Sequence, residues 1–337
     1  MQYRSPSRNV RSVYDVLEAF PSERVCVDHL ARMRWPNGEV CPNCGVVGRA
    51  YKVKLRFKCS YCKTFFSARK DTIFEESKVP LRKWFAAIFL FTSNRKGIPS
   101  TQLAREISVK QETAWFMLSR LRQVADNMAV EILKGIIEVD ECFIGGKERN
   151  KHAKKKLHNN WMQGKTIVVG AVERNGAVIT DRVPYRDRNS LQAFIMRRVY
   201  RGSTVYTDEH GAYKRLPQHK HKNTNHSIGQ YVNGDVHTQT IESFWAIVKR
   251  AHKGIYHQWS QKHCDLYLRE FELRWNLRRL PDGDRLDVFL QHVNGTRLTY
   301  EDLKHGQRKQ LRKRKARQLR KGVTRRGRKK GTQRRRK

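Results

Sequence analysis

The chain has 337 residues and a formal net charge of +40, from 71 Lys and Arg against 31 Asp and Glu. This length fits two domains with appendages. The charge is unlike that of a typical small-molecule enzyme and favours a polyanionic partner, nucleic acid first. The longest apolar run, residues 84–91, is far shorter than the ~20 residues of a membrane helix. Residues 1–10 are polar and lack the apolar core of a signal peptide.

A predicted helical lead-in at residues 10–35 precedes two Cys-x-x-Cys pairs with 14 residues between them. Each pair makes a tight turn that directs two thiolates at one point, and four thiolates suit a closed, tetrahedral zinc site. Residues 51–58 between the pairs alternate roughly as a strand does. We therefore predict a zinc ribbon within residues 10–75 that holds structural Zn²⁺. The alternative is a chance cluster of free thiols. The predicted ligands are Cys41, Cys44, Cys59 and Cys62.

Residues 79–126 have apolar residues at the three- and four-residue spacing of helices. A first helix at 81–91 is broken at 97–99, and a second one follows. Ser108 with Gln111 three residues later predicts a capping box for a third, basic helix. A helix, a short turn and a basic helix fit a helix-turn-helix DNA-binding module, although a plain three-helix bundle has the same pattern. The predicted groove-facing residues are Lys110, Gln111, Thr113 and Arg120.

Residues 135–280 change to short β-rich runs followed by long helices, which predicts a mixed α/β layer. The strands are expected at 135–146, 166–173, 177–183 and 203–208, with a short one after them, and the helices at 190–200 and 241–253.

Acidic residues at strand ends of such a layer can meet an acid from a packing helix. Asp140, Asp208 and Glu242 are the candidates, because Mg²⁺ prefers oxygen ligands and two such ions can activate a nucleophile and stabilise a leaving oxygen. Lys249 lies on the same helix face as Glu242 and can approach a phosphate there. Other acids compete with these three, and physical reasoning alone leaves the choice open; they are Glu138, Glu141, Glu209 and Asp235.

The C-terminal residues 304–337 hold 19 Lys or Arg and no acid, so that about +21 remains on the rest of the chain. Such a composition cannot bury a core, and we expect a disordered tail. A phosphate-binding arm is the favoured interpretation, and a solvated extension is the alternative.

The order of these modules resembles that of zinc-ribbon insertion-sequence DDE transposases, the ISXO2-like and Merlin superfamily. The resemblance covers residues 19–303. It departs at Gln239, where many relatives have Asn, and at Cys142, where Thr or Tyr is commoner. The matching phrases are RWPNG (34–38), CPNCG (41–45), TIFE (72–75), PLRKW (80–84), QLARE (102–106), VDE (139–141), IGGKE (144–148), VVGAV (168–172), VYTDE (205–209), HTQTIESFW (237–245), KR (249–250), YH (256–257) and EF (270–271).

The resemblance implies an RNase H-like catalytic domain at residues 135–280, with a C-terminal extension at 281–303. It implies metal ligation by Asp140, Asp208 and Glu242, with 33 residues between the last two, and it matches Lys249 to a basic residue past the Glu.

The predicted protein is a transposase that binds its element's terminal inverted repeats and uses Mg²⁺ or Mn²⁺ to cut and transfer DNA. Its partners would be double-stranded DNA, at transposon ends and target, and further copies of itself in a dimer or larger synaptic assembly, with no membrane. It would act at the nucleoid in a bacterial cytoplasm or in a eukaryotic nucleus. The alternatives are a catalytically inactive or domesticated DNA-binding regulator and a structural nucleoid or RNA-packaging protein.

Overall fold

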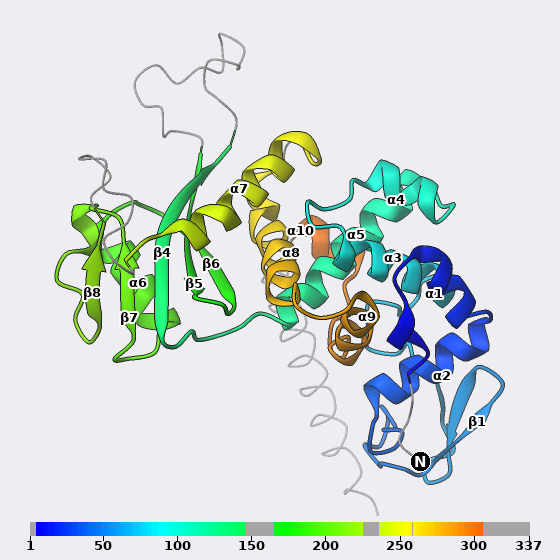
Figure 1. Cartoon of the computed structure of the whole chain (residues 1–337). Helices are drawn as coiled ribbons and strands as arrows, with labels where there is room; N and C mark the ends of the chain where they lie inside the picture. Colours follow the sequence, from blue (N-terminus) through cyan, green and yellow to red (C-terminus); the bar gives the residue numbers. More distant parts are fainter. Residues whose placement is uncertain (1–4, 146–164, 225–235, 258, 306–337) are drawn as a thin grey trace, which may run out of the picture. The chain divides into compact units, whose positions relative to one another are not determined.

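The computed structural model describes residues 5–145, 165–224, 236–257 and 259–305 (Figure 1). The chain divides into two compact units, residues 1–296 and 297–337. The described part of the second unit, residues 297–305, contains a short helix, α10 (Tyr300–His305). From residue 306 onward, the predicted basic tail lies outside the described residues. Within the described ranges, no helix is both long enough and apolar enough to cross a membrane.

The N-terminal lead-in contains a short 3₁₀ turn (Pro6–Asn9) and the helices α1 (Val13–Ala19) and α2 (Glu23–Arg34). The predicted single strand after them is a hairpin of β1 (Ala50–Val53) and β2 (Arg56–Cys59), with β3 (Phe65–Phe66) antiparallel to β2. The chain reverses at Lys54, which has a positive φ of 56°. The rings of Trp35, Phe57 and Phe66 pack with centroids 5.7 to 5.8 Å apart, giving the ribbon a small aromatic core.

Three helices follow the ribbon as predicted, namely α3 (Leu81–Ser93), α4 (Ser100–Glu106) and α5 (Gln111–Asn127). Their apolar residues share one core with α1, α2 and the later helix α9 (Asp282–Gln291). The predicted capping box is wrong. Helix α5 begins at Gln111 without a side-chain cap, and Ser108 stands in the turn with φ 51°. The Gln111 amide donates instead to Ser100 Oγ at 2.8 Å, which links the starts of α4 and α5.

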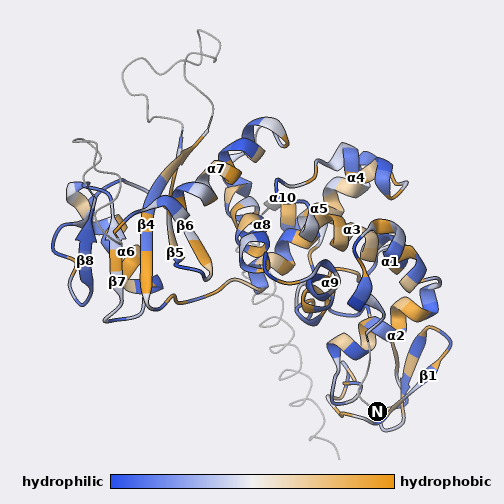
Figure 2. Ribbon diagram, in the orientation of Figure 1, coloured by the Kyte–Doolittle hydropathy of each residue, from blue (hydrophilic) through white to orange (hydrophobic). Residues whose placement is uncertain are grey.

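The mixed α/β layer is a five-stranded sheet in the order β6-β5-β4-β7-β8. Strands β4, β5 and β6 run antiparallel, whereas β7 and β8 run parallel to β4. In Figure 2 the central strands are largely orange and the edge strand β8 is blue, because the sequence of β8 is polar. The side chains of β8 are also mostly exposed. The strand bounds are β4 Ile136–Ile144, β5 Thr166–Glu173, β6 Val178–Val183, β7 Thr204–Thr207 and β8 Lys220–Asn223.

Helices cover both faces of this sheet. Helix α6 (Arg188–Arg198) packs on the face formed by Ile137 and Val139, and α7 (Gln239–Gly254) and α8 (Cys264–Asn276) pack on the face that includes Cys142. Because side chains alternate along a strand, residues 138, 140 and 142 point toward α7. This alternation decides which acids of β4 can meet the acid on α7.

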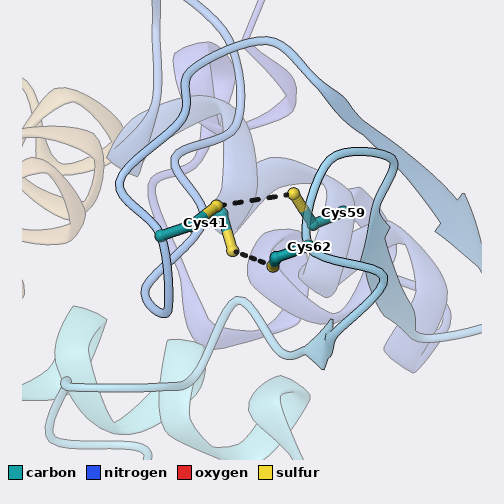
Figure 3. Close-up of side chains that lie close together, drawn as sticks. Cys41, Cys59 and Cys62 are labelled. Atoms are coloured by element: carbon teal, nitrogen blue, oxygen red, sulfur yellow. Dashed lines mark hydrogen bonds between the residues drawn. The ribbon is translucent and has the colours of Figure 1, made fainter.

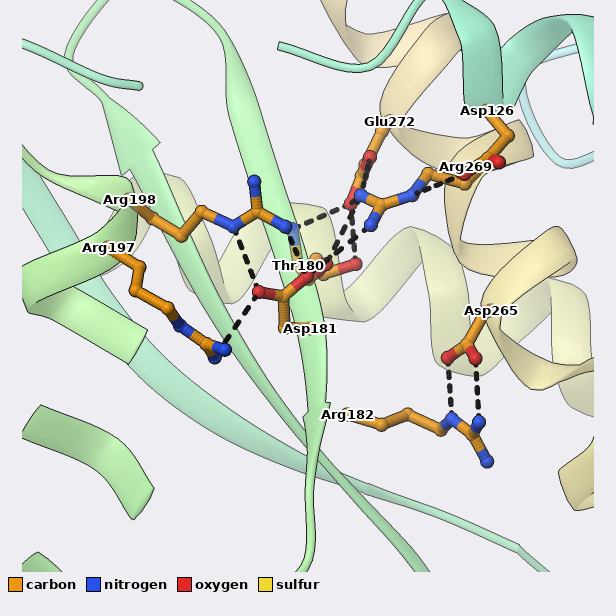
Figure 4. Close-up of polar contacts among 9 residues, drawn as sticks. All are labelled: Asp126, Thr180, Asp181, Arg182, Arg197, Arg198, Asp265, Arg269 and Glu272. Atoms are coloured by element: carbon orange, nitrogen blue, oxygen red, sulfur yellow. Dashed lines mark hydrogen bonds and ion pairs between the residues drawn. The ribbon is translucent and has the colours of Figure 1, made fainter. Parts of the chain in front are cut away.

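Helix α8 joins the sheet to α5 through charged side chains. Buried Glu272 accepts hydrogen bonds from the Thr180 N–H and hydroxyl, both at 2.6 Å, and Arg269 pairs with both Glu272 and Asp126 of α5 (Figure 4). On another side of α8, fully buried Glu270 accepts from Arg122 Nε of α5 at 2.6 Å. These contacts place the helical module and the α/β layer in one compact unit.

Candidate metal centre and active site

The four predicted zinc ligands come together. Their sulfur atoms all lie within 4.8 Å of one another, with 3.6 Å between Cys41 and Cys62 and 3.7 Å between Cys44 and Cys59. Figure 3 shows the labelled thiols of Cys41, Cys59 and Cys62 turned toward one point. The first turn closes through a 2.8 Å hydrogen bond from Gly45 N to Cys41 O, and Gly45 has φ 77°, a conformation that glycine adopts without strain. Four converging thiols fit a structural zinc ion with no open position for catalysis.

Asp140 lies in the middle of β4 on the α7 side, directly opposite Gly170 of β5. Burial, which is the largest cause, together with the negative charges of Glu141, Asp208 and Glu242, raises the pKa of its carboxyl group to about 7. An ordinary Asp has a pKa near 3.9. Asp140 is therefore in the field of both other predicted ligands, at a site where a cation would be stabilised.

Asp208 and Glu242 reach this place from two other elements. Asp208 directly follows β7 and accepts from the His210 N–H at 3.0 Å, and Arg186 Nη2 lies 3.9 Å from its other carboxylate oxygen. Glu242 is exposed in the first turn of α7 and accepts from the Thr238 hydroxyl at 2.8 Å. The three carboxylates are spaced more widely than the thiols: across the described ranges, the cysteines are the one group of possible metal ligands with all ligand atoms within 4.8 Å.

Gly170 lets α7 approach the sheet beside Asp140. A Cβ atom at this position would lie 2.5 Å from Cζ2 of Trp245 and 3.2 Å from Cδ1 of Ile241, both in α7. The first of these distances is far below van der Waals contact. The indole of Trp245 therefore lies against the glycine backbone, and this close packing sets how near Glu242 comes to Asp140.

Glu138 has a structural position that the sequence had left open. Its fully buried carboxylate accepts from the Thr240 N–H at 2.8 Å, the Thr240 hydroxyl at 2.9 Å and the Ile241 N–H at 3.2 Å. Arg174 Nε donates to it at 3.1 Å. An anion at a helix N-terminus satisfies N–H groups that have no partner within the helix. Glu138 thus fixes the first turn of α7, which carries Glu242, on the strand that carries Asp140.

Glu141 points to the opposite face of the sheet. It accepts from the hydroxyl of buried Tyr213 at 2.5 Å and pairs with Arg186, whose guanidinium also approaches Asp208. Sequence reasoning did not single out Arg186 or Tyr213, because nothing local marks them. Of the remaining competing acids, Glu209 is half-buried beside Asp208, and Asp235 lies outside the described residues.

Lys249 is exposed two turns beyond Glu242 on α7. Its positive charge acts on the buried thiol of Cys142, opposing the burial that raises the pKa of that thiol to about 12. Since Cys142 is two residues past Asp140 on the same face of β4, Lys249 lies over the part of the sheet that carries the acids.

The predicted DNA-reading residues do not all lie on one surface. Lys110 and Gln111 are exposed and Thr113 is half-buried at the start of α5. The prediction for Arg120 is wrong, because its side chain is only 8% exposed. Its guanidinium donates to the Ile73 carbonyl at 2.6 Å and so holds the loop after the ribbon.

The chain combines a cysteine ribbon with an acid-bearing α/β layer, and both parts match profiles of transposase domains. The sequence matches the profile of the transposase zinc-ribbon domain over residues 21–64 and that of the ISXO2-like transposase domain over residues 132–276. These spans enclose all four cysteines and all three predicted acidic ligands. The chain is 30% identical over 297 residues to the "uncharacterized protein in transposable element ISH50" of Halobacterium salinarum, covering 82% of this chain and 98% of that protein. The chain belongs to the ISXO2-like transposase family.

Among solved structures, the crystal structure of the Mos1 strand transfer complex has a similar chain. The sequences are 13% identical, the match covers 67% of this chain and 82% of that chain, and the TM-score is 0.26. This likeness is too weak to inform the fold.

Proposed function

We propose that the chain is an active DDE transposase whose α/β layer is an RNase H-like catalytic domain. The observation that carries the proposal is that Asp208, after β7, and Glu242, on α7, both lie near enough to Asp140 of β4 for their charges to raise the pKa of its carboxyl group. The packing of α7 on the sheet through Glu138 and Gly170 supports the proposal, because these contacts keep Glu242 close to the sheet.

These three carboxylates would hold Mg²⁺ or Mn²⁺, since hard divalent cations prefer anionic oxygen ligands. The bound ions would activate water, and later a DNA 3′-hydroxyl, and stabilise the leaving oxygen in an in-line displacement at phosphorus. Lys249 would contact a phosphate oxygen and orient the strand. Asp140 has to be deprotonated to bind a cation, and a bound cation would in turn lower the pKa of the Asp140 carboxyl group.

DNA is the proposed partner, at the element's terminal inverted repeats and at the target. The α4–α5 pair would form a helix-turn-helix with Lys110, Gln111 and Thr113 at its exposed start. The basic tail would add phosphate contacts that do not read sequence. Both element ends have to be joined to one target, so we propose a dimer or larger assembly.

The test is cleavage of labelled element-end DNA in Mg²⁺ and in EDTA, run beside a binding assay. Asp140→Asn, Asp208→Asn and Glu242→Gln should each lower cleavage by about 10³-fold, because several kcal/mol of charge stabilisation are lost and 1.36 kcal/mol is tenfold in rate. End binding should remain. Glu209→Gln is the matched control and should keep most activity. Full activity of Glu242→Gln would show that the third ligand is misassigned.

The alternative function is a DNA-binding regulator that has the transposase fold. The retained acids and Lys249 favour the enzyme. A wild-type protein that binds element ends with normal affinity and never cuts them in Mg²⁺ or Mn²⁺ would favour the regulator.

A further inference from the structure

A polar pocket of about 570 Å³ opens at the start of α7. Its walls come from the β5–β6 turn, from the first turn of α7 and from the C-terminal end of α8 with the residues that follow it. Gln239 and Ser243 contribute from α7, on either side of Glu242 in sequence. Residues three apart on a helix have Cβ atoms about 5–6 Å apart, so one wall of this pocket adjoins the proposed active site. Its basic lining residues are Arg174, His237, Arg278 and Arg279.

Two of these arginines are not paired with an acid. Arg174 pairs with Glu138. In contrast, no carboxylate of the described ranges pairs with Arg278 or Arg279. Arg278 donates to the carbonyl groups of Gly176 and Trp275, and Arg279 donates to the Asn175 side chain at 3.3 Å. Burial lowers the pKa of Arg278, and the charge of Arg279 lowers it further. The pocket therefore holds positive charge without a matching anion.

An uncharged donor also belongs to one of the lining residues. The indole N–H of Trp275, which lines the pocket, is buried without an acceptor. The backbone N–H groups of Thr240 and Ile241 are not available, because Glu138 accepts them. An anion would consequently be bound by guanidinium and other side-chain groups rather than by the helix terminus. Arginine forks match the geometry of phosphate oxygens.

We infer that this pocket binds a backbone phosphate of the DNA strand that flanks the scissile bond. The inference rests on the proposed function and adds a strand-holding subsite to it. A strand with one phosphate at Asp140, Asp208 and Glu242 would place a neighbouring phosphate over Gln239 and Ser243. Binding of the neighbouring phosphate would fix which phosphodiester bond is cut, since a small displacement of the reacting atoms lowers the reaction rate strongly.

The experiment compares Arg279→Gln with Arg201→Gln. Both side chains are exposed and both changes remove one positive charge, but Arg201 precedes β7 whereas Asp208 follows it. Duplex affinity is measured in EDTA as salt is varied. Arg279→Gln should weaken element-end binding by about tenfold and reduce the salt slope by about 0.9, the value for one lost phosphate contact. Arg201→Gln should change neither. Ser243→Glu, which puts a negative charge into the pocket, should reproduce the loss.

Duplexes with a single uncharged methylphosphonate near the cut then identify the phosphate. At one position in the DNA, the methylphosphonate should weaken binding by the wild-type protein as much as Arg279→Gln weakens binding to unmodified DNA. At that same position, the methylphosphonate should cause no further loss of affinity in the Arg279→Gln protein. The inference would be overturned if the methylphosphonate weakened binding by the wild-type and Arg279→Gln proteins equally at every position. It would also be overturned if Arg201→Gln lost as much affinity as Arg279→Gln. If the coupling is found and wild-type protein never cuts, the pocket stands and the proposed catalytic function fails.

Discussion

The zinc ribbon and the proposed active site are built in opposite ways. The paired thiols of the ribbon are at most 21 residues apart in sequence, on two tight turns that lie before and after a small hairpin. The active site depends on contacts such as that between Glu138 and Thr240, which are 102 residues apart. The ribbon has only a small aromatic core, and we expect it to depend on a bound metal ion, whereas the position of the acids depends on how a helix packs on a sheet. Variants that damage one region should therefore leave the other intact.

The largest effect is expected from Cys44→Ser. Removing one thiolate should eliminate most of the zinc-binding free energy, which is about 10–16 kcal/mol for small structural sites. Residues 38–70 should then unfold while the five-stranded sheet stays folded. Metal analysis and hydrogen exchange measure the two results separately.

Cys26→Ser is the matched control for this variant. Cys26 is a buried thiol of α2 outside the cluster, so zinc should remain at one per chain. Unchanged zinc in Cys44→Ser would refute the predicted ligand set. Loss of protection in β4 and β5 would refute the independence of the two regions.

A smaller effect, about 2–4 kcal/mol of stability, is expected from Glu138→Gln. The amide replaces one acceptor oxygen by a donor that faces N–H groups, and it leaves Arg174 without its buried partner. Helix α7 should loosen and Glu242 should move from Asp140. The Mg²⁺ concentration for half-maximal cleavage should rise more than the maximal rate falls, which a general loss of stability would not produce.

Glu131→Gln makes the same chemical change at an exposed glutamate before β4. It should alter neither the unfolding midpoint nor the Mg²⁺ requirement. A Glu138→Gln protein with wild-type values for both would show that Glu138 does not position α7.

The same contrast explains what the sequence could and could not predict. Spacing alone identified the four cysteines, because their geometry is set by the two turns that contain them. Alternation along β4 placed Asp140 on one face, but it could not separate Asp140 from Glu138. That distinction depends on Thr240 and Ile241 of α7, which donate to Glu138. Arg120 was misplaced for a similar reason, since its partner is a carbonyl in the loop after the ribbon.

Gly170→Ala tests the close approach of α7 directly. The new methyl group would lie 2.5 Å from Trp245, and overpacking of this kind costs about 1–3 kcal/mol. Cleavage should fall with stability, because α7 is pushed from the sheet. Urea unfolding and cleavage rate are the measurements.

Gly211→Ala is the control, because its Cβ atom would meet nothing within 4 Å. Trp245→Phe should rescue part of the stability of Gly170→Ala, since it removes the colliding ring edge together with an indole N–H that has no acceptor. Losses that simply add in the double variant would show that the two residues do not collide.

The smallest effect is expected from Asp126→Asn, at the contact between α5 and α8. The Asp126 carboxylate is 50% exposed, and Arg269 keeps Glu272 and Asp181 as partners after the change (Figure 4). Exposed pairs contribute about 0–1 kcal/mol, so the urea midpoint should hardly move. Asp265→Asn is the control, since Asp265 is equally exposed but pairs with Arg182 within the α/β layer.

Buried Glu270 offers a second contact between α5 and α8, through Arg122. If this contact holds the two helices together, Glu270→Gln should lower the free energy of unfolding by about 3–5 kcal/mol, because it leaves Arg122 unpaired. A larger loss of stability from Asp126→Asn than from Glu270→Gln would mean that the exposed pair of Asp126 and Arg269 holds α5 and α8 together.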